Sequence, residues 1–123
     1  MEKNFVTAAT AQNATETTKT KIASIVVPQN VTKLVEVGVQ VFGSGLTTLE
    51  SVSFILEIES TDIVPQAFAS DTCLPLTSGS PVFPSRIHDC DIAVIAGSTL
   101  DFYTTFNAIL TVNPSCRIFG KFR

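Results

Sequence analysis

The sequence predicts an all-β domain built as an antiparallel sandwich of two sheets. Several segments alternate apolar and polar residues with the period of two that a half-buried strand requires. No stretch longer than one turn combines helical periodicity with helix caps. Composition agrees, because strand-favouring Thr, Val and Ile number sixteen, thirteen and ten among the 123 residues. A chain of this length forms one domain around a single core.

The clearest alternation predicts two strands between Lys33 and Glu59. They are separated by a turn-rich segment around Gly43 and Gly45. That segment is longer than a tight hairpin turn, so we expect antiparallel neighbours whose direct pairing is not assured. The positions expected on the buried side are Val35, Val37, Val39 and Val41 in the first run, and Val52, Phe54, Leu56 and Ile58 in the second.

Two further strands and a long loop are expected around this region. A short strand over residues 21–27 ends at Pro28, which lacks a backbone donor. A brief strand over residues 63–70 contains Pro65, and proline suits an edge strand. Residues 71–85 are rich in Pro, Ser and Thr and therefore predict a loop, which at this length is usually functional or part of an interface.

The last third of the chain predicts three more strands. The first covers residues 86–96 and ends before a turn at Gly97. The longest alternation begins at Leu100 and extends over up to thirteen residues, with room for a bulge. Residues 116–122 form the closing strand. The total of seven or eight strands is typical of a two-sheet sandwich.

Residues 1–20 are predicted to be an N-terminal arm, and residues 21–123 the sandwich domain. Thr, Ala, Asn and Gln dominate the arm, so we expect it to be flexible in an isolated subunit. Phe5 and Val6 are apolar exceptions that can anchor it. The opening residues lack the apolar core of a signal peptide, and no apolar run approaches the length of a membrane span. We therefore expect neither feature.

Charge is sparse and unevenly placed. Charged residues make up 15% of the chain, against about 25% in an average soluble domain, which indicates surface buried against other chains. Residues 34–85 contain six carboxylates and no Lys or Arg, whereas the cations lie near the two ends. Two explanations stay open: a basic tail and arm that contact an acidic face of the same or a neighbouring subunit, or scattered solvated charges. The net charge of -3 argues against nucleic-acid binding.

Catalytic chemistry is scarce in this sequence. His88 is the only histidine, and strand alternation places it on one face with Cys90. The pair lies in no recognised nucleophile motif, so a structural histidine is favoured and we expect no enzyme and no cofactor. Cys73, Cys90 and Cys116 are odd in number and lack metal spacing, which favours unpaired thiols, although a bridge between Cys73 and Cys90 stays open.

Two clusters of acidic residues offer the carboxylate oxygens that calcium prefers as ligands. One consists of Asp89 and Asp91, and the other of Glu57, Glu59 and Asp62. Neither follows a calcium-loop pattern, and carboxylates on a strand surface are usually solvated. We therefore expect no metal site.

Short strands of Thr, Val and Ile, a polar arm, a long Pro-rich connection and a sparsely charged body together resemble the single jelly-roll capsid proteins of icosahedral viruses. The resemblance covers most of residues 21–123 and implies eight strands, with contacts through sheet edges, loops and an arm that ties subunits together. The strand count reaches eight when residues 5–9 or 67–70 supply one more strand. An immunoglobulin-like sandwich otherwise stays open.

The resemblance implies a structural subunit of a virus capsid or similar shell. It would assemble in the host cytoplasm, reside in the virion, contact copies of itself or other capsid proteins, and recognise no nucleic-acid sequence. The alternative is an adhesin-like sandwich that binds a ligand or carbohydrate through loops at one end. Residues expected at the assembly interface are Phe5, Val6, Leu74, Leu76, Val82, Phe83, Arg117, Lys121 and Arg123.

Overall fold

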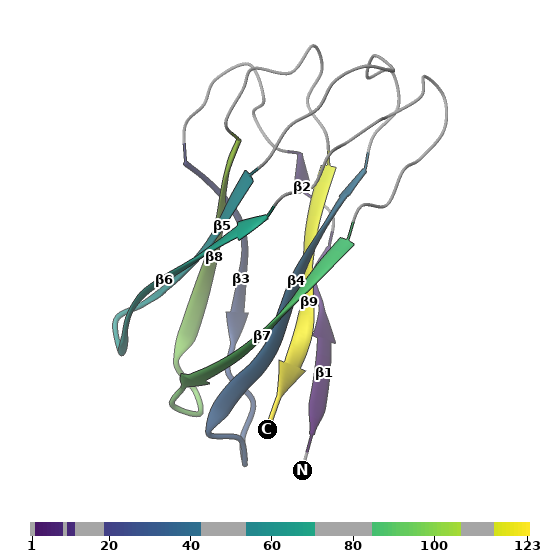
Figure 1. The fold of residues 1–123 in the computed structure, drawn as a ribbon. Helices are drawn as coiled ribbons and strands as arrows, with labels where there is room; N and C mark the ends of the chain where they lie inside the picture. The colour runs from purple at the N-terminus through teal and green to yellow at the C-terminus, as the bar shows by residue number, and fades with distance from the viewer. Residues whose placement is uncertain (1, 9, 12–18, 43–53, 71–84, 107–114) are drawn as a thin grey trace.

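The computed structural model describes residues 2–8, 10–11, 19–42, 54–70, 85–106 and 115–123. These residues form two antiparallel sheets packed face to face, so the predicted all-β sandwich is confirmed (Figure 1). The strands are β1 (Lys3–Val6), β2 (Thr10–Ala11), β3 (Thr20–Val26), β4 (Lys33–Phe42), β5 (Phe54–Ser60), β6 (Ile63–Ser70), β7 (Ser85–Ala93), β8 (Thr99–Phe106) and β9 (Ser115–Phe122). The described part of the chain contains no helix that is long and apolar enough to cross a membrane.

The strand order identifies the sandwich as a jelly roll. Sheet A has the order β1-β9-β4-β7, with β2 also paired to β9, and sheet B has the order β3-β8-β5-β6. Apart from the two-residue β2, the first strand pairs with the last, β3 with β8, β4 with β7, and β5 with β6. This nested pairing is a long hairpin rolled into two sheets, as in a jelly roll. The eighth strand is β1, which overlaps the segment 5–9 that the strand count required.

The core lies between the sheets and follows the predicted alternation. Leu56 and Ile58 of β5 and Val37 and Val39 of β4 are fully buried, as the period of two requires. Val35 departs from this pattern, because the pairing of β4 shifts between Leu34 and Glu36 on both sides of the strand. Such a shift marks a bulge, which moves one residue out of alternation. Other fully buried side chains are Leu34, Leu100, Phe102, Cys116 and Ile118.

The prediction that β4 and β5 are sheet neighbours is wrong. β4 pairs with β7 and β9 in sheet A, whereas β5 pairs with β6 and β8 in sheet B. Alternation shows which side of a strand is buried but does not name its partner. Both strands bury apolar faces against the same core from opposite sides, so the pattern is equally consistent with pairing or with packing across the sandwich.

The other predicted strands agree with the structure where it describes them. β3, β7 and β9 match three expected strands within a few residues, and β6, which carries Pro65, is an edge strand as expected. The long loop and the second half of the thirteen-residue alternation fall at 71–84 and 107–114, outside the described residues. Residues 3–6 and 10–11 pair with β9 of their own chain. This part of the predicted arm therefore belongs to sheet A, and the division at residue 20 stays a prediction.

Candidate assembly surface

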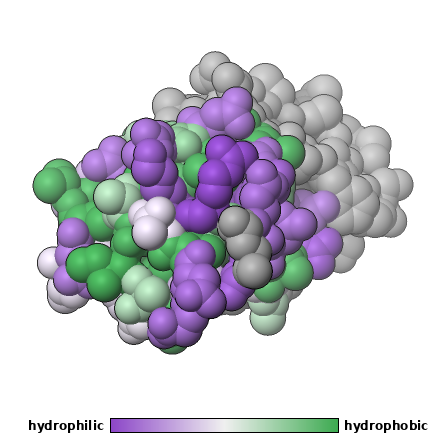
Figure 2. Space-filling model, turned by 90° about the horizontal axis from the view of Figure 1, so that it is seen from below, coloured by the Kyte–Doolittle hydropathy of each residue, from purple (hydrophilic) through white to green (hydrophobic). Residues whose placement is uncertain are grey.

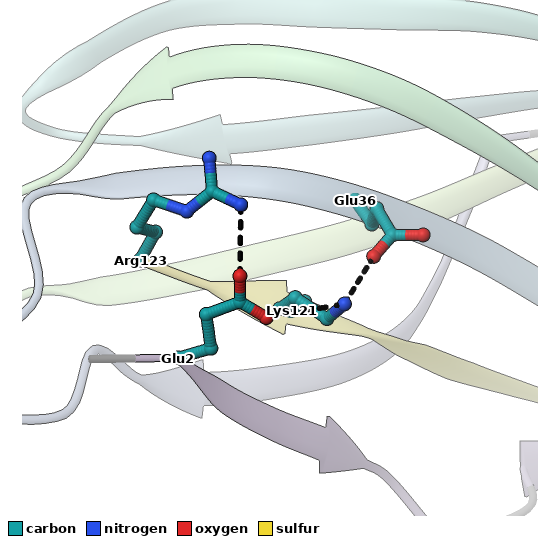
Figure 3. Close-up of polar contacts among 4 residues, drawn as sticks. All are labelled: Glu2, Glu36, Lys121 and Arg123. Atoms are coloured by element: carbon teal, nitrogen blue, oxygen red, sulfur yellow. Dashed lines mark hydrogen bonds and ion pairs between the residues drawn. The ribbon is translucent and has the colours of Figure 1, made fainter.

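The two ends of the chain are joined by ion pairs on the outer face of sheet A (Figure 3). Arg123 Nη2 donates a hydrogen bond to Glu2 Oε1 at 2.8 Å. Lys121 Nζ lies 3.3 Å from Glu2 Oε2 and 2.9 Å from Glu36 Oε2. We call these four residues the terminal latch. It shows that the basic C-terminal end meets carboxylates of its own subunit, which was one of the two explanations left open for the charge distribution.

Opposite charges in the latch stabilise the ionised forms. Hydrogen bonds from Arg123 and then Lys121 hold the pKa of Glu2 below its usual value of 4.5. Hydrogen bonds to Glu36 and then Glu2 raise the pKa of Lys121 above 10.5. Both groups lie at the surface, where solvent weakens such pairs. The latch therefore adjusts how firmly β1 is held and is not the main source of stability.

We expect acid to loosen β1 through Glu2. Because the folded-state pKa of Glu2 is lowered, its contribution is present above pH 4.5 and is lost as the pH falls through that lowered value. Glu2→Gln should speed hydrogen exchange of the β1 amides by at most about fivefold at pH 7. The difference from the wild type should vanish in acid.

Asp62→Asn is the matched control, because Asp62 is an exposed carboxylate outside the latch. It should leave β1 exchange unchanged at every pH. Equal exchange of β1 in Glu2→Gln and wild-type protein across the whole pH range would show that the latch does not hold the strand.

The cations near the N-terminal side are also paired within the subunit. Lys19 bonds both Glu57 and Glu59 on the outer face of sheet B, and its Nζ lies 4.5 Å from the ring centroid of Tyr103. Hydrogen bonds to Glu57 and then Glu59 raise the pKa of Lys19, and the hydrogen bond from Lys19 lowers the pKa of Glu57. Lys21 pairs with Asp101 at 3.2 Å, and Lys33 pairs with Asp91 at 3.0 Å. Within the described residues, most of the cations are thus paired with carboxylates of the same subunit.

Apolar residues form a row across all four main strands of sheet A. Val6 of β1 lies opposite Phe119 of β9, Phe119 opposite Gly38 of β4, and Gly38 opposite Ile87 of β7. Val6 is 66% exposed and Ile87 is 56% exposed. Because Gly38 has no side chain, the row dips between its flanking apolar groups. We call these four residues the apolar row.

The apolar row borders a hollow and a row of polar residues. The hollow measures about 300 Å³, and Ile87, Phe119 and Lys121 contribute to its lining. Two residues away along each strand lies the row of polar residues. There Asn4 lies opposite Lys121, and Lys121 lies opposite Glu36. Apolar surface edged by polar groups is typical of a protein contact surface. The sequence placed Val6 in such a surface but missed Ile87 and Phe119.

The end of the sandwich formed by the β3–β4, β5–β6 and β7–β8 turns also exposes apolar side chains. Figure 2 looks onto this end and shows hydrophobic atoms gathered toward one side of it. Val26 is 64% exposed, Val64 is 76% exposed and Ile95 is 59% exposed. β3 and β6 are the opposite margins of sheet B, so Val26 and Val64 are exposed at separate places. Apolar side chains exposed singly are usual on a protein surface, and these three do not define a contact surface.

Phe5, one of the predicted interface residues, packs inward against its own subunit. Its ring centroid lies 5.0 Å from that of Phe122 and 6.2 Å from that of Phe102, which belongs to the opposite sheet. Phe5 pairs with Gly120, where a Cβ atom would come within 2.8 Å of the Phe5 ring. The absence of a side chain at Gly120 therefore makes room for this ring. Phe5 anchors β1 to the core.

The remaining predicted interface residues lie in β9, directly after it, or in segments that the structure does not describe. Arg117 Nε donates a hydrogen bond to Gln40 at 2.5 Å, while Lys121 and Arg123 belong to the terminal latch. Leu74, Leu76, Val82 and Phe83 lie outside the described residues. A role of the nine residues in assembly stays a prediction.

His88 and Cys90 share one face of β7, as predicted. The His88 ring packs against Phe68 with centroids 5.2 Å apart, and Cys90 Sγ donates to the Leu34 carbonyl at 3.3 Å. Burial, and then the carboxylate of Asp89 and its acidic neighbours, raise the pKa of Cys90 to about 11. The thiol is therefore protonated at neutral pH, which is unfavourable for a nucleophile.

The other cysteines and the candidate calcium groups add no reactive centre to the described part of the chain. Burial raises the pKa of Cys116 to about 12, and Cys90 and Cys116 are both unpaired thiols, as the sequence favoured. Cys73 lies outside the described residues. Glu57 and Glu59 bind Lys19. Within the described residues, His, Cys, Asp and Glu side chains form no cluster of three or more that could hold a metal ion.

Comparison with known proteins gives a likeness in fold. No protein-family model matches the sequence, and no curated protein matches it. The structure is similar to a chain in a solved structure of infectious bursal disease virus, Gx strain, with a TM-score of 0.51 and 13% sequence identity. The match covers 99% of this chain and 33% of that chain, so this chain spans about a third of the viral one. At this identity the likeness concerns the fold, and it confirms the predicted resemblance at that level.

Proposed function

We propose that this chain is a structural subunit of a virus capsid or a similar protein shell. The observation that carries the proposal is the nested strand pairing of a jelly roll together with the likeness, over nearly the whole chain, to a chain from a virus structure. In this role the protein acts mechanically. Copies of it associate in the virion, and it needs neither a cofactor nor an enzymatic activity to do so.

The surface chemistry supports association between copies. Five of the cations in the described residues, Lys19, Lys21, Lys33, Lys121 and Arg123, bind carboxylates of their own subunit. Val6 and Ile87, at the two ends of the apolar row, remain exposed. Contacts through such surfaces gain free energy from buried apolar area, and symmetric copies can repeat them around a closed shell. We therefore expect association that depends only weakly on salt.

The proposal is tested by expressing the full chain and measuring its mass by light scattering, with negative-stain electron microscopy of any large species. We expect closed particles or discrete symmetric oligomers that persist between about 0.1 and 0.5 M salt, where surface ion pairs are screened. Ile87→Lys, in the apolar row, should reduce assembly. Thr32→Lys, at another exposed position, is the control and should not.

A folded monomer at all concentrations would contradict the proposal. If such a monomer also bound a member of a glycan array, the result would favour the alternative of a carbohydrate-binding sandwich.

A further inference from the structure

β6 is an edge strand that, unlike the other edge strands, contains no charged residue. It lies at the margin of sheet B, and within the described part of the chain it pairs with β5 alone (Figure 1). Its other side therefore presents a row of backbone N–H and C=O groups, which can template pairing with another strand. Val64 is 76% exposed, and Gln66 and Ala67 are also exposed.

The four edges of the sandwich carry different amounts of charge. β1 contains Lys3, β3 contains Lys21, and β7 contains Asp89 and Asp91 among other charged residues. β6 contains no charged residue in its eight positions. Proteins commonly protect an edge strand by placing charges on it, because a charge is costly to pair against another chain. On β6 the protection is confined to the first half of the strand, which contains Pro65, a register irregularity between Ile63 and Gln66, and a Val64 carbonyl that accepts a hydrogen bond from Gln66 Nε2 at 3.1 Å.

We propose that β6 pairs antiparallel with β6 of a second copy of this chain, around a two-fold axis. In a two-fold contact the same patch meets itself, so a charge near the axis faces its own copy. Among the edge strands of the described residues, β6 alone avoids this repulsion. The small exposed side chain of Ala67 also allows close approach. Two B sheets would then form one continuous sheet of eight strands.

We expect the pairing of the two β6 strands to be weak. It rests on the proposed function and names one contact through which copies in a shell would associate. Two strands of this length bury less area than the roughly 1,600 Å² of a standard stable interface. Val64, at the start of β6, and Ile55, which is 47% exposed on the neighbouring β5, add apolar area beside the junction. We therefore expect a weak dimer in isolation, with the contact reinforced where many copies surround one another in a shell.

A matched pair of substitutions tests the contact. Val64→Lys places a charge on β6, and Val26→Lys places the same charge on β3, the opposite edge of the same sheet, at a similarly exposed valine. Ala67→Lys is a second β6 variant nearer the centre of the strand. Sedimentation velocity over a range of concentrations measures association. Hydrogen exchange at low and high concentration shows whether the amides of β6 become protected.

We expect the wild type and Val26→Lys to associate alike, with β6 amides protected at high concentration. Both β6 variants should weaken association by at least about tenfold. If the β6 variants associate like the wild type, or if association leaves β6 unprotected, the edge contact is overturned while the shell function stands. A wild type that stays monomeric and forms no particles overturns both.

Discussion

Replacing Phe102 with alanine should lower the free energy of unfolding by about 3–5 kcal/mol, the range for removing a buried phenylalanine. Phe102 is fully buried in β8, where it lies opposite Ala23 of β3 and Ile58 of β5. Its ring also lies 6.2 Å from that of Phe5 in the opposite sheet. The substitution therefore leaves a cavity between the layers that neither sheet can fill without moving as a whole. Urea denaturation followed by circular dichroism measures the loss.

Tyr103→Ala is the control for this prediction, because the next residue of the same strand points out of the sandwich. Tyr103 is half-buried beneath Lys19, so its removal should cost only about 1 kcal/mol, the scale of an exposed cation–π contact. If Phe102→Ala and Tyr103→Ala were equally destabilising, Phe102 would not be the central contact between the sheets.

The sequence predicted the sandwich because strand burial is a local property. Leu56 and Ile58, like Val37 and Val39, occupy alternate positions and are fully buried. Pairing is not local in the same sense, which is why β4 and β5 were wrongly expected in one sheet. A jelly roll pairs the ends of the chain with each other. The partner of β1 is β9, more than a hundred residues away, and no pattern within either strand identifies it.

The composition and the length of β1 prevented its prediction as a strand. Four residues are too few to show a convincing alternation, and the surrounding Thr, Ala and Asn are typical of a flexible arm. Phe5 was the available signal, since one large aromatic residue in a polar segment needs a place to be buried. Its place is beside Gly120, and that pairing becomes visible only when the two ends of the chain are brought together.

The candidate surface was predictable in its chemistry but not in its location. Sparse charge, with cations near the ends, indicated intrachain ion pairs or contacts between subunits, and the structure shows ion pairs at Lys121 and Arg123. The apolar row could not be found in the sequence, because Ile87 and Phe119 become neighbours of Val6 only through the register of four strands. Each is an ordinary outward-facing residue in its own strand.

Gly120→Ala should be the most damaging small substitution on β9. A Cβ at this position would lie 2.3 Å from the backbone oxygen of Glu36 and 2.8 Å from the Phe5 ring. The carbonyl belongs to central strand β4 beside its bulge, so it cannot move aside as a side-chain tip can. We expect a loss of about 1–3 kcal/mol, the range for overpacking, together with faster amide exchange in β1 and in the β4–β9 ladder.

The double variant Phe5→Ala/Gly120→Ala separates the two clashes. Phe5→Ala removes the aromatic contact but leaves the Glu36 carbonyl in place, so the alanine at position 120 should still destabilise the Phe5→Ala background. Exchange in β4 should then remain fast even though the ring has gone. If Phe5→Ala instead abolished the cost of Gly120→Ala, the ring would be what requires glycine at position 120. If Gly120→Ala were as stable as the wild type, β4 and β9 would not approach as closely as the structure shows.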